Sequence, residues 1–402
     1  MINIPPYILK VLNNLNNNGF EGYLVGGCVR DALMGKTAHD FDITTNALPK
    51  EIISCFKGMK IIETGLKHGT VTVVSDGENV EITTYRIDGK YTDNRHPENV
   101  SFTRNIHEDL SRRDFTVNAI AYSPHDGFVD AFGGQEDIKK SIIRCVGCPD
   151  TRFSEDGLRI MRAIRFSSVL SFDIDNDTSL SIHKNKNLLT NISAERIYSE
   201  LKKLLSGNNV SNVLKEYYDV LCVIFPVFKK YCELYYSNLA MVPLSPNDSI
   251  SRMCTLFYGM NTDDIKTSIK LLKPDNYLYE NVLMLSKYLV SDINLDKTSI
   301  RYIMNKLSDE NIIRLSKIKK LFSSGFMADE FINQYNNQVK ACACVHIKDL
   351  KIKGDEIINL GVKKGPKIGE IMNKLLHAVI EDKCSNDNQS LKKYIISSII
   401  NQ

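Results

Sequence analysis

The pattern of hydrophobic and polar positions divides the 402-residue chain into two regions. Residues 1–145 mix short β-branched runs with Gly and Asp turns, which predicts strands alternating with helices. From about residue 150 onward, nearly all apolar positions recur at helical spacing. The segment 195–205, for example, places Ile197 and Leu201 on one face and its charges on the other. The pattern therefore predicts an α/β region followed by a helical region.

A β-hairpin is predicted within the first region. Polarity alternates over Thr70–Val74, and a second strand pattern returns over Val80–Ile87. The Asp76-Gly77 dipeptide between them is typical of a tight two-residue turn. Upstream, the segment 24–43 indicates an apolar strand, a break at two glycines, a short helix and a second apolar strand.

Composition narrows the class of protein. The length exceeds what one compact core usually holds, so we expect two or more domains. The net charge is only +3, so nucleic-acid binding would depend on local basic patches. No apolar run approaches the roughly 18 residues of a membrane span, and the N-terminal segment lacks the pattern of a signal peptide. We therefore expect no contact with a membrane.

The ten cysteines are scattered along the chain, which suits reduced thiols in a cytoplasm better than a disulfide framework. Cys145 and Cys148 form a CxxC motif, and Cys342 and Cys344 lie two positions apart. Neither pair has the second matching pair that a structural zinc site usually needs, so zinc and redox roles are the less favoured interpretations.

Asp40 and Asp42 lie where the second apolar strand is expected. On a strand, residues i and i+2 face the same side about 7 Å apart, so the two carboxylates should project together, with Phe41 behind them. Adjacent carboxylates repel unless a cation lies between them, and oxygen ligands suit Mg²⁺ together with substrate phosphates. We predict Mg²⁺ at Asp40 and Asp42, with Glu81 on the neighbouring strand as a third catalytic carboxylate. The alternative is that these residues lie on an exposed edge or face of the sheet.

Gly26 and Gly27 precede a predicted helix and let backbone N–H groups approach an anion closely. Arg30 would supply a guanidinium fork for a triphosphate. Taken alone, the glycines are as typical of a plain strand-to-helix turn. Together with the paired carboxylates, they indicate a site for a nucleoside triphosphate and two divalent ions, as in phosphoryl transfer.

Several segments together resemble the class II tRNA nucleotidyltransferase and bacterial poly(A) polymerase family. They are GGCVRD, DFDI, RRDFTVNAIAY, RFSEDGLRIMRAIRF and ERIYSELKKLL, and they cover most of the first 205 residues in the family's order. The resemblance implies an α+β fold, in which a polymerase-β-like nucleotidyltransferase head (a mixed sheet with helices) precedes all-α neck, body and tail domains. The corresponding boundaries are 1–145 for the head, 146–205 for the neck, 206–335 for the body and 336–402 for the tail.

The segment Glu155–Phe166 is expected to form a helix on which Asp156 and Arg159, three positions apart, are neighbours. An acceptor beside a donor matches the amino group and ring nitrogen that both cytosine and adenine present. Uracil and guanine would mispair, at about 1–3 kcal/mol for each buried polar group. The resemblance implies that this pair selects the base; the alternative is a solvated ion pair. By resemblance, further arginines contact the nucleotide: Arg113, Arg162 and Arg165.

Two further details concern this region. Asp114 and Asn118 are expected to brace their turn and to help contact the sugar, or to act only as a helix N-cap and a polar bracing residue. Gly157 stands where family members commonly carry Ala or Pro. Glycine costs a helix about 0.5–1 kcal/mol relative to Ala, so we expect a somewhat less rigid segment.

The branch of the family is indicated by two segments. Residues 63–74 resemble the CCA-adding branch, and Arg86–Phe102 resembles the full-length loop of enzymes that add complete CCA. The resemblance implies template-independent addition of CCA to the 3′ end of tRNA from CTP and ATP, with Mg²⁺ as cofactor and release of pyrophosphate. Addition of A alone or of CC alone, poly(A) synthesis and RNA binding without catalysis are the alternatives.

The C-terminal segment 350–383 resembles the tail of long bacterial CCA-adding enzymes. Its lysines Lys363, Lys364 and Lys367 alternate with glycines, which suits a sequence-independent grip on an RNA backbone. The alternative is an ordinary pair of helices with surface lysines. The sequence does not indicate an oligomeric state.

Overall fold

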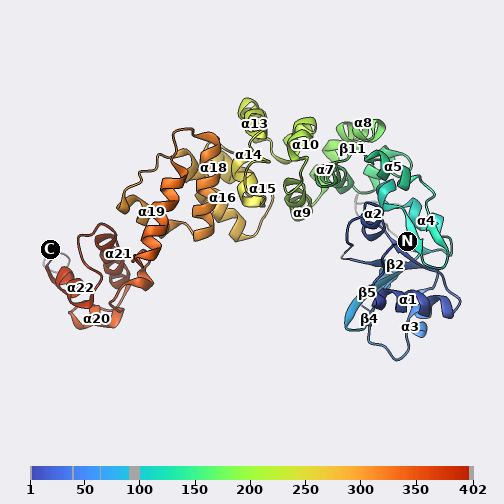
Figure 1. Ribbon diagram of the computed structural model, residues 1–402, viewed down its shortest axis with the longest axis horizontal. Coiled ribbons are helices and arrows are strands. Elements are labelled where there is room, and N and C mark those ends of the chain that lie inside the picture. Colours follow the sequence, from blue (N-terminus) through green and yellow to red (C-terminus); the bar gives the residue numbers. More distant parts are fainter. Residues whose placement is uncertain (1, 39, 64, 90–99, 398–402) are drawn as a thin grey trace. The chain divides into compact units, whose positions relative to one another are not determined.

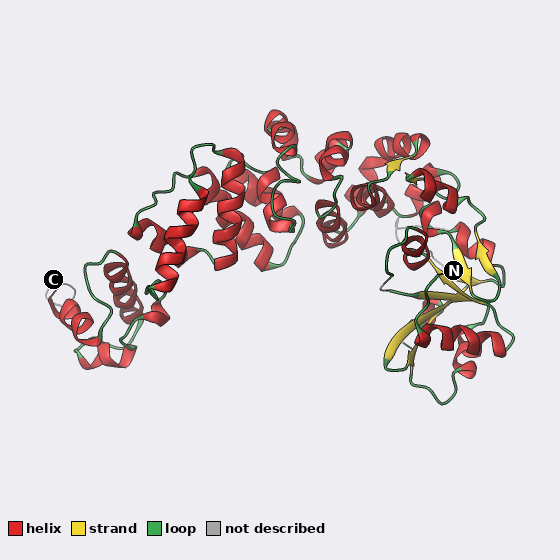
Figure 2. Ribbon diagram, viewed as in Figure 1, coloured by secondary structure: helices red, strands yellow, loops and turns green. Residues whose placement is uncertain are grey.

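Figure 1 shows the computed structural model, which describes residues 2–38, 40–63, 65–89 and 100–397. The chain folds as two compact units. One comprises Met1–Cys232 with Ser268–Pro274, and the other comprises Glu233–Thr267 with Asp275–Gln402. The described strands all belong to the first unit, and the second is helical (Figure 2). The predicted α+β architecture is confirmed, while the finer division into head, neck, body and tail stays a prediction.

The sheet of the first unit contains the strands that position the site. Its order is β3-β4-β5-β2-β1-β8-β9. The bounds are β1 Gly22–Val25, β2 Asp42–Thr45, β3 Ile61–Ile62, β4 Thr70–Ser75, β5 Glu78–Thr84, β8 Ala121–Ser123 and β9 Gly127–Val129. β2 pairs with β5 in parallel and with β1 antiparallel, so the sheet is mixed, as predicted. β2 therefore has a paired strand on each side.

The predicted hairpin is formed by β4 and β5. Asp76 and Gly77 have φ values of 53° and 90°, as a two-residue turn with positive φ at both positions requires. The second strand ends at Thr84, earlier than predicted, and Arg86–Asp88 (β6) pairs instead with Val100–Phe102 (β7). The rest of the predicted loop over 86–102 lies mostly outside the described residues.

Helices cover both faces of this sheet. α1 (Pro6–Asn17) buries Ile8, Val11, Leu12 and Leu15 at helical spacing, and it packs with α3 (Pro49–Cys55) against β4. A separate buried cluster includes Tyr23 and Val25 of β1 together with Ile106 and Leu110 of α4 (Ile106–Ser111). The remaining helices of this part are α2 (Gly27–Leu33) and α5 (Gly134–Lys140).

A group of short helices completes the first unit. They are α6 (Pro149–Glu155), α7 (Leu158–Leu170), α8 (Asn176–Asn185), α9 (Ala194–Leu205), α10 (Val210–Glu216), α11 (Tyr218–Ile224) and α12 (Val227–Lys230). α7 packs along α9, which buries Ile197, Leu201 and Leu204 as its amphipathic pattern predicts.

The prediction of an uninterrupted helix over Glu155–Phe166 is wrong. α6 ends at Glu155, and Asp156 is extended, with φ −142° and ψ 104°. Its Oδ1 accepts a hydrogen bond from the Leu158 backbone N–H at 3.0 Å, and its carbonyl accepts one from the Arg159 N–H at 2.9 Å. Asp156 therefore caps the start of α7, because a short acidic side chain satisfies free N–H groups better at a helix start than inside a helix.

The second unit is built of helices whose starts are often capped by acidic or hydroxyl side chains, such as Asp248, Asp275, Asp296 and Ser308. They are α13 (Cys232–Leu239), α14 (Ser249–Leu256), α16 (Asn276–Val290), α17 (Lys297–Lys306), α18 (Asp309–Phe322), α19 (Ala328–Lys340), α20 (Gly354–Asn359), α21 (Pro366–Ile380) and α22 (Asn388–Ile395). α15 (Thr262–Leu271) begins in this unit, and its residues from Ser268 onward belong to the first unit. None of the helices in the described parts of the chain is long and apolar enough to cross a bilayer.

Candidate active site

The turn between β1 and α2 depends on a glycine. Gly26 has φ 78° and ψ −131°, a conformation that side chains of L-residues rarely adopt. A Cβ at Gly26 would lie 3.3 Å from Nη1 of Arg113, and one at Gly27 would lie 3.7 Å from Nη2 of Arg30. The absence of side chains here lets two guanidinium groups lie close to the backbone of the turn.

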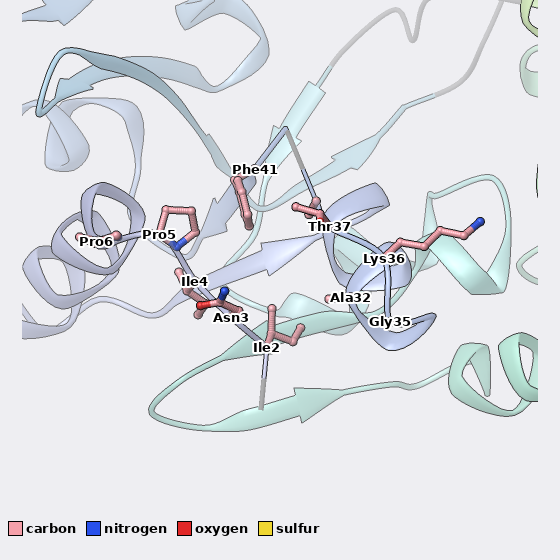
Figure 3. Close-up of a pocket in the computed structure, with 11 residues that line it drawn as sticks. Ile2, Asn3, Ile4, Pro5, Pro6, Ala32, Gly35, Lys36, Thr37 and Phe41 are labelled. Atoms are coloured by element: carbon pink, nitrogen blue, oxygen red, sulfur yellow. The ribbon is translucent and has the colours of Figure 1, made fainter.

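Asp40 and Asp42 lie at the start of β2. Asp42 is the first residue of the strand, whereas Asp40 precedes the strand. Both are exposed, and Phe41 between them is buried, so the predicted alternation holds although Asp40 is not a strand residue. Phe41 lines a pocket of about 490 Å³ together with the N-terminal segment and the residues after α2 (Figure 3).

The carboxylates influence one another. Although the Asp42 side chain reaches solvent, protein atoms around it remove part of its hydration, and this desolvation raises its pKa. The charges of Asp40 and Glu81 add to the increase, and Arg113 opposes it. Glu81 is close because β5 pairs with β2 in parallel, with Ile82 opposite Ile43. Desolvation is the larger cause of the raised pKa of Asp42, and the negative charges of Asp40 and Glu81 add to it.

The donor set fits a hard divalent cation. Mg²⁺ commonly binds one or two carboxylates and completes its shell with water and substrate phosphates, which Asp40 and Asp42 could support. Among the described residues, no group of three or more His, Cys, Asp or Glu side chains is arranged to hold a metal. The role of Glu81 as a catalytic carboxylate therefore stays a prediction.

A chain of hydrogen bonds joins α2 to α7. Nη2 of Arg30 donates to Oδ1 of Asp31 at 2.7 Å, and Nη1 donates to Oδ1 of Asn118 at 2.8 Å. Nδ2 of Asn118 donates to Oδ1 of Asp114 at 3.1 Å. Nε of Arg162 donates to Oδ2 of Asp114 at 2.7 Å. Arg30 is thus held from two sides, and its binding to a triphosphate stays a prediction.

Asp114 is the charged centre of this network. Burial alone would raise its pKa, but the charge of Arg162 and the hydrogen bonds from Asn118 and Arg162 outweigh burial and lower the pKa of Asp114. Asp114 and Asn118 therefore brace this turn through hydrogen bonds, a role that both interpretations of the sequence include. Their contact with the sugar stays a prediction.

Phe166 lies at the centre of three arginines. The guanidinium carbons of Arg30, Arg162 and Arg165 lie 5.1, 5.5 and 3.5 Å from its ring centroid. Nε of Arg165 also donates to Oε2 of the buried Glu200 on α9 at 2.8 Å. Arg162 and Arg165 thus connect α7 to its neighbours, and their contact with nucleotide stays a prediction.

The expectation that Asp156 and Arg159 are neighbours on one helix face is wrong, because the helix breaks between α6 and α7. Oδ2 of Asp156 accepts a hydrogen bond from Nη2 of Arg196 at 2.8 Å. Arg159 instead pairs with Glu155 through Nη1 and donates from Nη2 to the carbonyl oxygen of Arg112 at 3.0 Å. Each candidate base-reading residue has partners of its own, and their joint role stays a prediction.

The sequence did not reveal the residues that form ion pairs and hydrogen bonds with the predicted site residues. Asp109, on α4, is fully buried and forms ion pairs with Arg112 and Arg113. Its signal was available, because these arginines follow it by three and four positions on a helix that also buries Ile106 and Leu110. Glu200 lies on the buried face of α9, so the expectation that the charges of segment 195–205 lie on the opposite face is wrong for this residue. Glu155 had a similar signal, because Arg159 follows it by four positions. Arg196 and Phe166 had none, because their partners depend on how α2, α7 and α9 pack.

The predicted tail lysines lie in the second unit. Lys363, Lys364 and Lys367 are all exposed around the start of α21. Gly361 and Gly365 beside them have φ values of 93° and 152°. The lysines therefore lie on a tight turn whose side chains face solvent, and their contact with RNA stays a prediction.

Three segments of the chain match known protein families, and these matches define the class of protein. Residues 22–144 match the poly A polymerase head domain family, and residues 171–232 match the probable RNA and SrmB-binding site of polymerase A. Residues 245–395 match the family described as tRNA nucleotidyltransferase domain 2, putative. With the mixed sheet and the paired aspartates at the start of β2, these matches define a nucleotidyltransferase with a poly A polymerase head.

Full-length relatives define the family. The chain is 35% identical over 390 residues to the CCA-adding enzyme of Lactobacillus helveticus, covering 96% of each protein. It is 36% identical over 396 residues to that of Ligilactobacillus salivarius, covering 95% of this chain and 94% of the relative. The structure of the Bacillus stearothermophilus CCA-adding enzyme in complex with CTP has 27% identity and a TM-score of 0.79, and 98% of both chains is covered. The chain belongs to the CCA-adding enzyme family. The family predicted from the sequence is thereby confirmed.

Proposed function

We propose that the chain adds CCA to the 3′ end of tRNA from CTP and ATP, with Asp40 and Asp42 as the residues that hold Mg²⁺. The observation that carries this assignment is the carboxylate pair at the start of β2, beside the Gly26 turn and Arg113. Its membership in a family of CCA-adding enzymes supports the reaction. A related structure is described in complex with CTP, which supports the nucleotide.

The residues of the chain then have distinct tasks. When bound, Mg²⁺ would lower the pKa of the attacking 3′-hydroxyl and neutralise charge on the departing pyrophosphate. Asp40 and Asp42 supply its oxygen ligands, and a bound cation would offset the charge of Asp40 that, after desolvation, raises the pKa of Asp42. The triphosphate is oriented by Arg113, by Arg30 and by the backbone N–H of Gly27, which lie together at the turn between β1 and α2.

Base choice belongs to Asp156 and Arg159. The carboxylate accepts from the exocyclic amino group of cytosine or adenine, and the guanidinium donates to the ring nitrogen. In this structure the two side chains are paired with Arg196 and Glu155. Reading a base therefore requires them to share or exchange these partners, which keeps both charges compensated before the nucleotide enters.

Two further observations support tRNA as the substrate and the cytoplasm as the location. The exposed turn with Lys363, Lys364 and Lys367 offers positive charge to the RNA backbone without reading its sequence. All ten cysteines are free thiols, which agrees with a reducing cytoplasm as the place of action.

Incorporation of radiolabelled CTP and ATP into a tRNA that ends before CCA tests the assignment. Three added nucleotides are expected from the unaltered chain, whereas one or two would indicate partial addition and a long product poly(A) synthesis. We expect Asp42→Ala to reduce incorporation at least about a hundredfold, because it removes a ligand of the group that stabilises the transition state. Asp177→Ala, at another exposed aspartate of the first unit, is the control. Equal incorporation by Asp42→Ala and the control would overturn the metal assignment.

A further inference from the structure

Asp109 is a buried carboxylate that the proposed function does not use. Its side chain is fully inaccessible to solvent. Its Oδ1 accepts from Nε and Nη2 of Arg112 at 3.0 and 2.8 Å and from the backbone N–H of Arg86 at 3.3 Å. Its Oδ2 lies 3.5 Å from Nη2 of Arg113 and 3.4 Å from Oγ1 of Thr44, a hydroxyl that also lies 3.1 Å from the carbonyl oxygen of Thr83. A buried charge with this many donors has its desolvation compensated, and it fixes the donors in place.

These donors come from separate segments of the fold. Thr44 belongs to β2, two residues after Asp42, and Arg86 begins β6. Arg112 and Arg113 follow α4 and lead into the turn that contains Asp114. One carboxylate thus ties the strand of the catalytic aspartates to the end of α4.

The arginines held by Asp109 also contact the remainder of the site. Arg113 lies over the Gly26 turn and close enough to Asp42 to influence its charge. The backbone carbonyl of Arg112 accepts the hydrogen bond from Nη2 of Arg159 at 3.0 Å. A shift of the residues after α4 would therefore change the position of Arg159 relative to β2.

We infer that Asp109 is a positioning residue for base selection: it holds Arg112 and Arg113 so that Arg159 keeps a fixed place relative to the carboxylates of β2. Asp109 touches neither nucleotide nor metal in this scheme and acts through the arginines. The inference rests on the proposed function, because it assigns the base-reading role to Arg159.

Asp109→Asn tests the inference, because it keeps the shape of the side chain and removes its charge. We measure kcat and KM for CTP and for UTP on the full-length protein, with tRNA ending before CCA. The expected result is a fall of about tenfold in the CTP-over-UTP preference, since weakened charged hydrogen bonds let Arg159 move. Asp156→Ala alters the base-reading pair itself, so it should lower the CTP-over-UTP preference more than Asp109→Asn does.

The matched control is Asp137→Asn. Asp137 is also buried, at 5% exposed, and accepts hydrogen bonds from Oγ1 of Thr116 at 2.6 Å and from Nε of Arg144. The same chemical change at this position should lower the thermal unfolding midpoint without altering the CTP-over-UTP preference. A change of preference specific to Asp109 separates positioning from loss of stability.

A second pair of variants serves if Asp109→Asn does not fold. Thr44→Val removes the hydroxyl that lies 3.4 Å from Oδ2 of Asp109 and 3.1 Å from the carbonyl oxygen of Thr83, and Thr44→Ser retains it. We expect Thr44→Val to lower the CTP-over-UTP preference and Thr44→Ser to leave it as in the unaltered chain. Equal preference in the two variants would contradict the inference.

These measurements distinguish a failure of the Asp109 inference from a failure of the proposed function. Unchanged preference in Asp156→Ala would overturn the base-reading role and this inference with it. Lower preference in Asp156→Ala, together with Asp109→Asn behaving like Asp137→Asn, would overturn the inference alone. Retained incorporation in Asp42→Ala would count against the metal assignment and leave the measurement on Asp109 valid.

Discussion

At the residue scale, Asp114 keeps its charge in a buried position. The ion pair with Arg162 and the amide of Asn118 lower its pKa even though burial acts in the opposite direction. The same carboxylate accepts the hydrogen bond of the Phe115 backbone N–H at 2.9 Å. It therefore serves at once as a local cap and as the link between the turn after α4 and α7.

The lowered pKa predicts how Asp114 contributes to stability at different pH values. A carboxyl with a folded pKa below its ordinary 3.8 stabilises the folded state above that value, and the contribution is lost as the pH falls through the folded pKa. At pH 7 we expect Asp114→Asn to cost about 2 kcal/mol, because it leaves Arg162 without its charged partner. The thermal unfolding midpoints of both proteins between pH 7 and pH 3 measure this. Their difference should shrink below pH 3.8, and a constant difference down to pH 3 would contradict the assignment.

At the scale of elements, the strand–turn–helix unit β1–α2 depends on local backbone geometry. The turn at Gly26 requires positive φ, and Arg113 lies where a side chain would otherwise project. The break between α6 and α7 also depends on a glycine, because Gly157 packs against η3 (Lys186–Asn191). A Cβ at Gly157 would lie 3.1 Å from Cβ of Leu188 and 3.2 Å from its carbonyl oxygen, which gives this departure from the family pattern a steric reason.

Gly26→Ala tests whether the turn matters for catalysis as well as for folding. Alanine at positive φ is strained by about 1–2 kcal/mol, and its Cβ would also displace Arg113. We expect a lower unfolding midpoint and reduced CTP incorporation.

Gly77→Ala provides the comparison for this experiment. Gly77 also has positive φ, at 90°, but a Cβ added there would meet no atom within 4 Å beyond its chain neighbours. The substitution should therefore lower the unfolding midpoint to a similar degree and leave incorporation intact once folded protein is compared. Equal loss of incorporation in the two variants would show that strain alone explains the effect.

At the scale of the whole molecule, the candidate catalytic residues and the candidate RNA-binding lysines belong to two different units. The paired aspartates and the arginine network belong to the unit that contains the sheet, and the exposed lysines beside α21 belong to the helical unit. The buried core around α20, α21 and α22, with Ile357, Leu375 and Leu391, supports that lysine turn. Substitutions in the turn should therefore affect binding of tRNA separately from binding of CTP.

The triple variant Lys363→Gln, Lys364→Gln and Lys367→Gln tests this separation. We expect the KM for tRNA to rise about tenfold at moderate salt, with the KM for CTP unchanged. The slope of log affinity against log salt should fall by about two, because each lost phosphate contact removes somewhat less than one released counterion. A control with the same loss of charge replaces exposed lysines of the other unit: Lys57, Lys139 and Lys140. An equal effect of both triple variants would indicate net charge rather than a specific grip.

The sequence by itself determined the features that arise from neighbours along the chain. Alternation and turn chemistry predicted β4 and β5 with Asp76-Gly77 between them, and helical periodicity predicted α9. The spacing of Asp40 and Asp42 around a buried Phe41 also follows from local geometry, even though β2 begins only at Asp42. Motifs in family order supplied the reaction, which the full-length relatives support.

Only the tertiary structure decided which charges meet. Asp156 pairs with Arg196, 40 positions further along the chain, because the helix breaks after Glu155 and α9 packs along α7. Asp109 joins β2 to the end of α4 for a similar reason. Local periodicity specifies which face of an element is buried, but the partner of a buried charge depends on segments far apart in sequence, whose contacts form only when the elements pack.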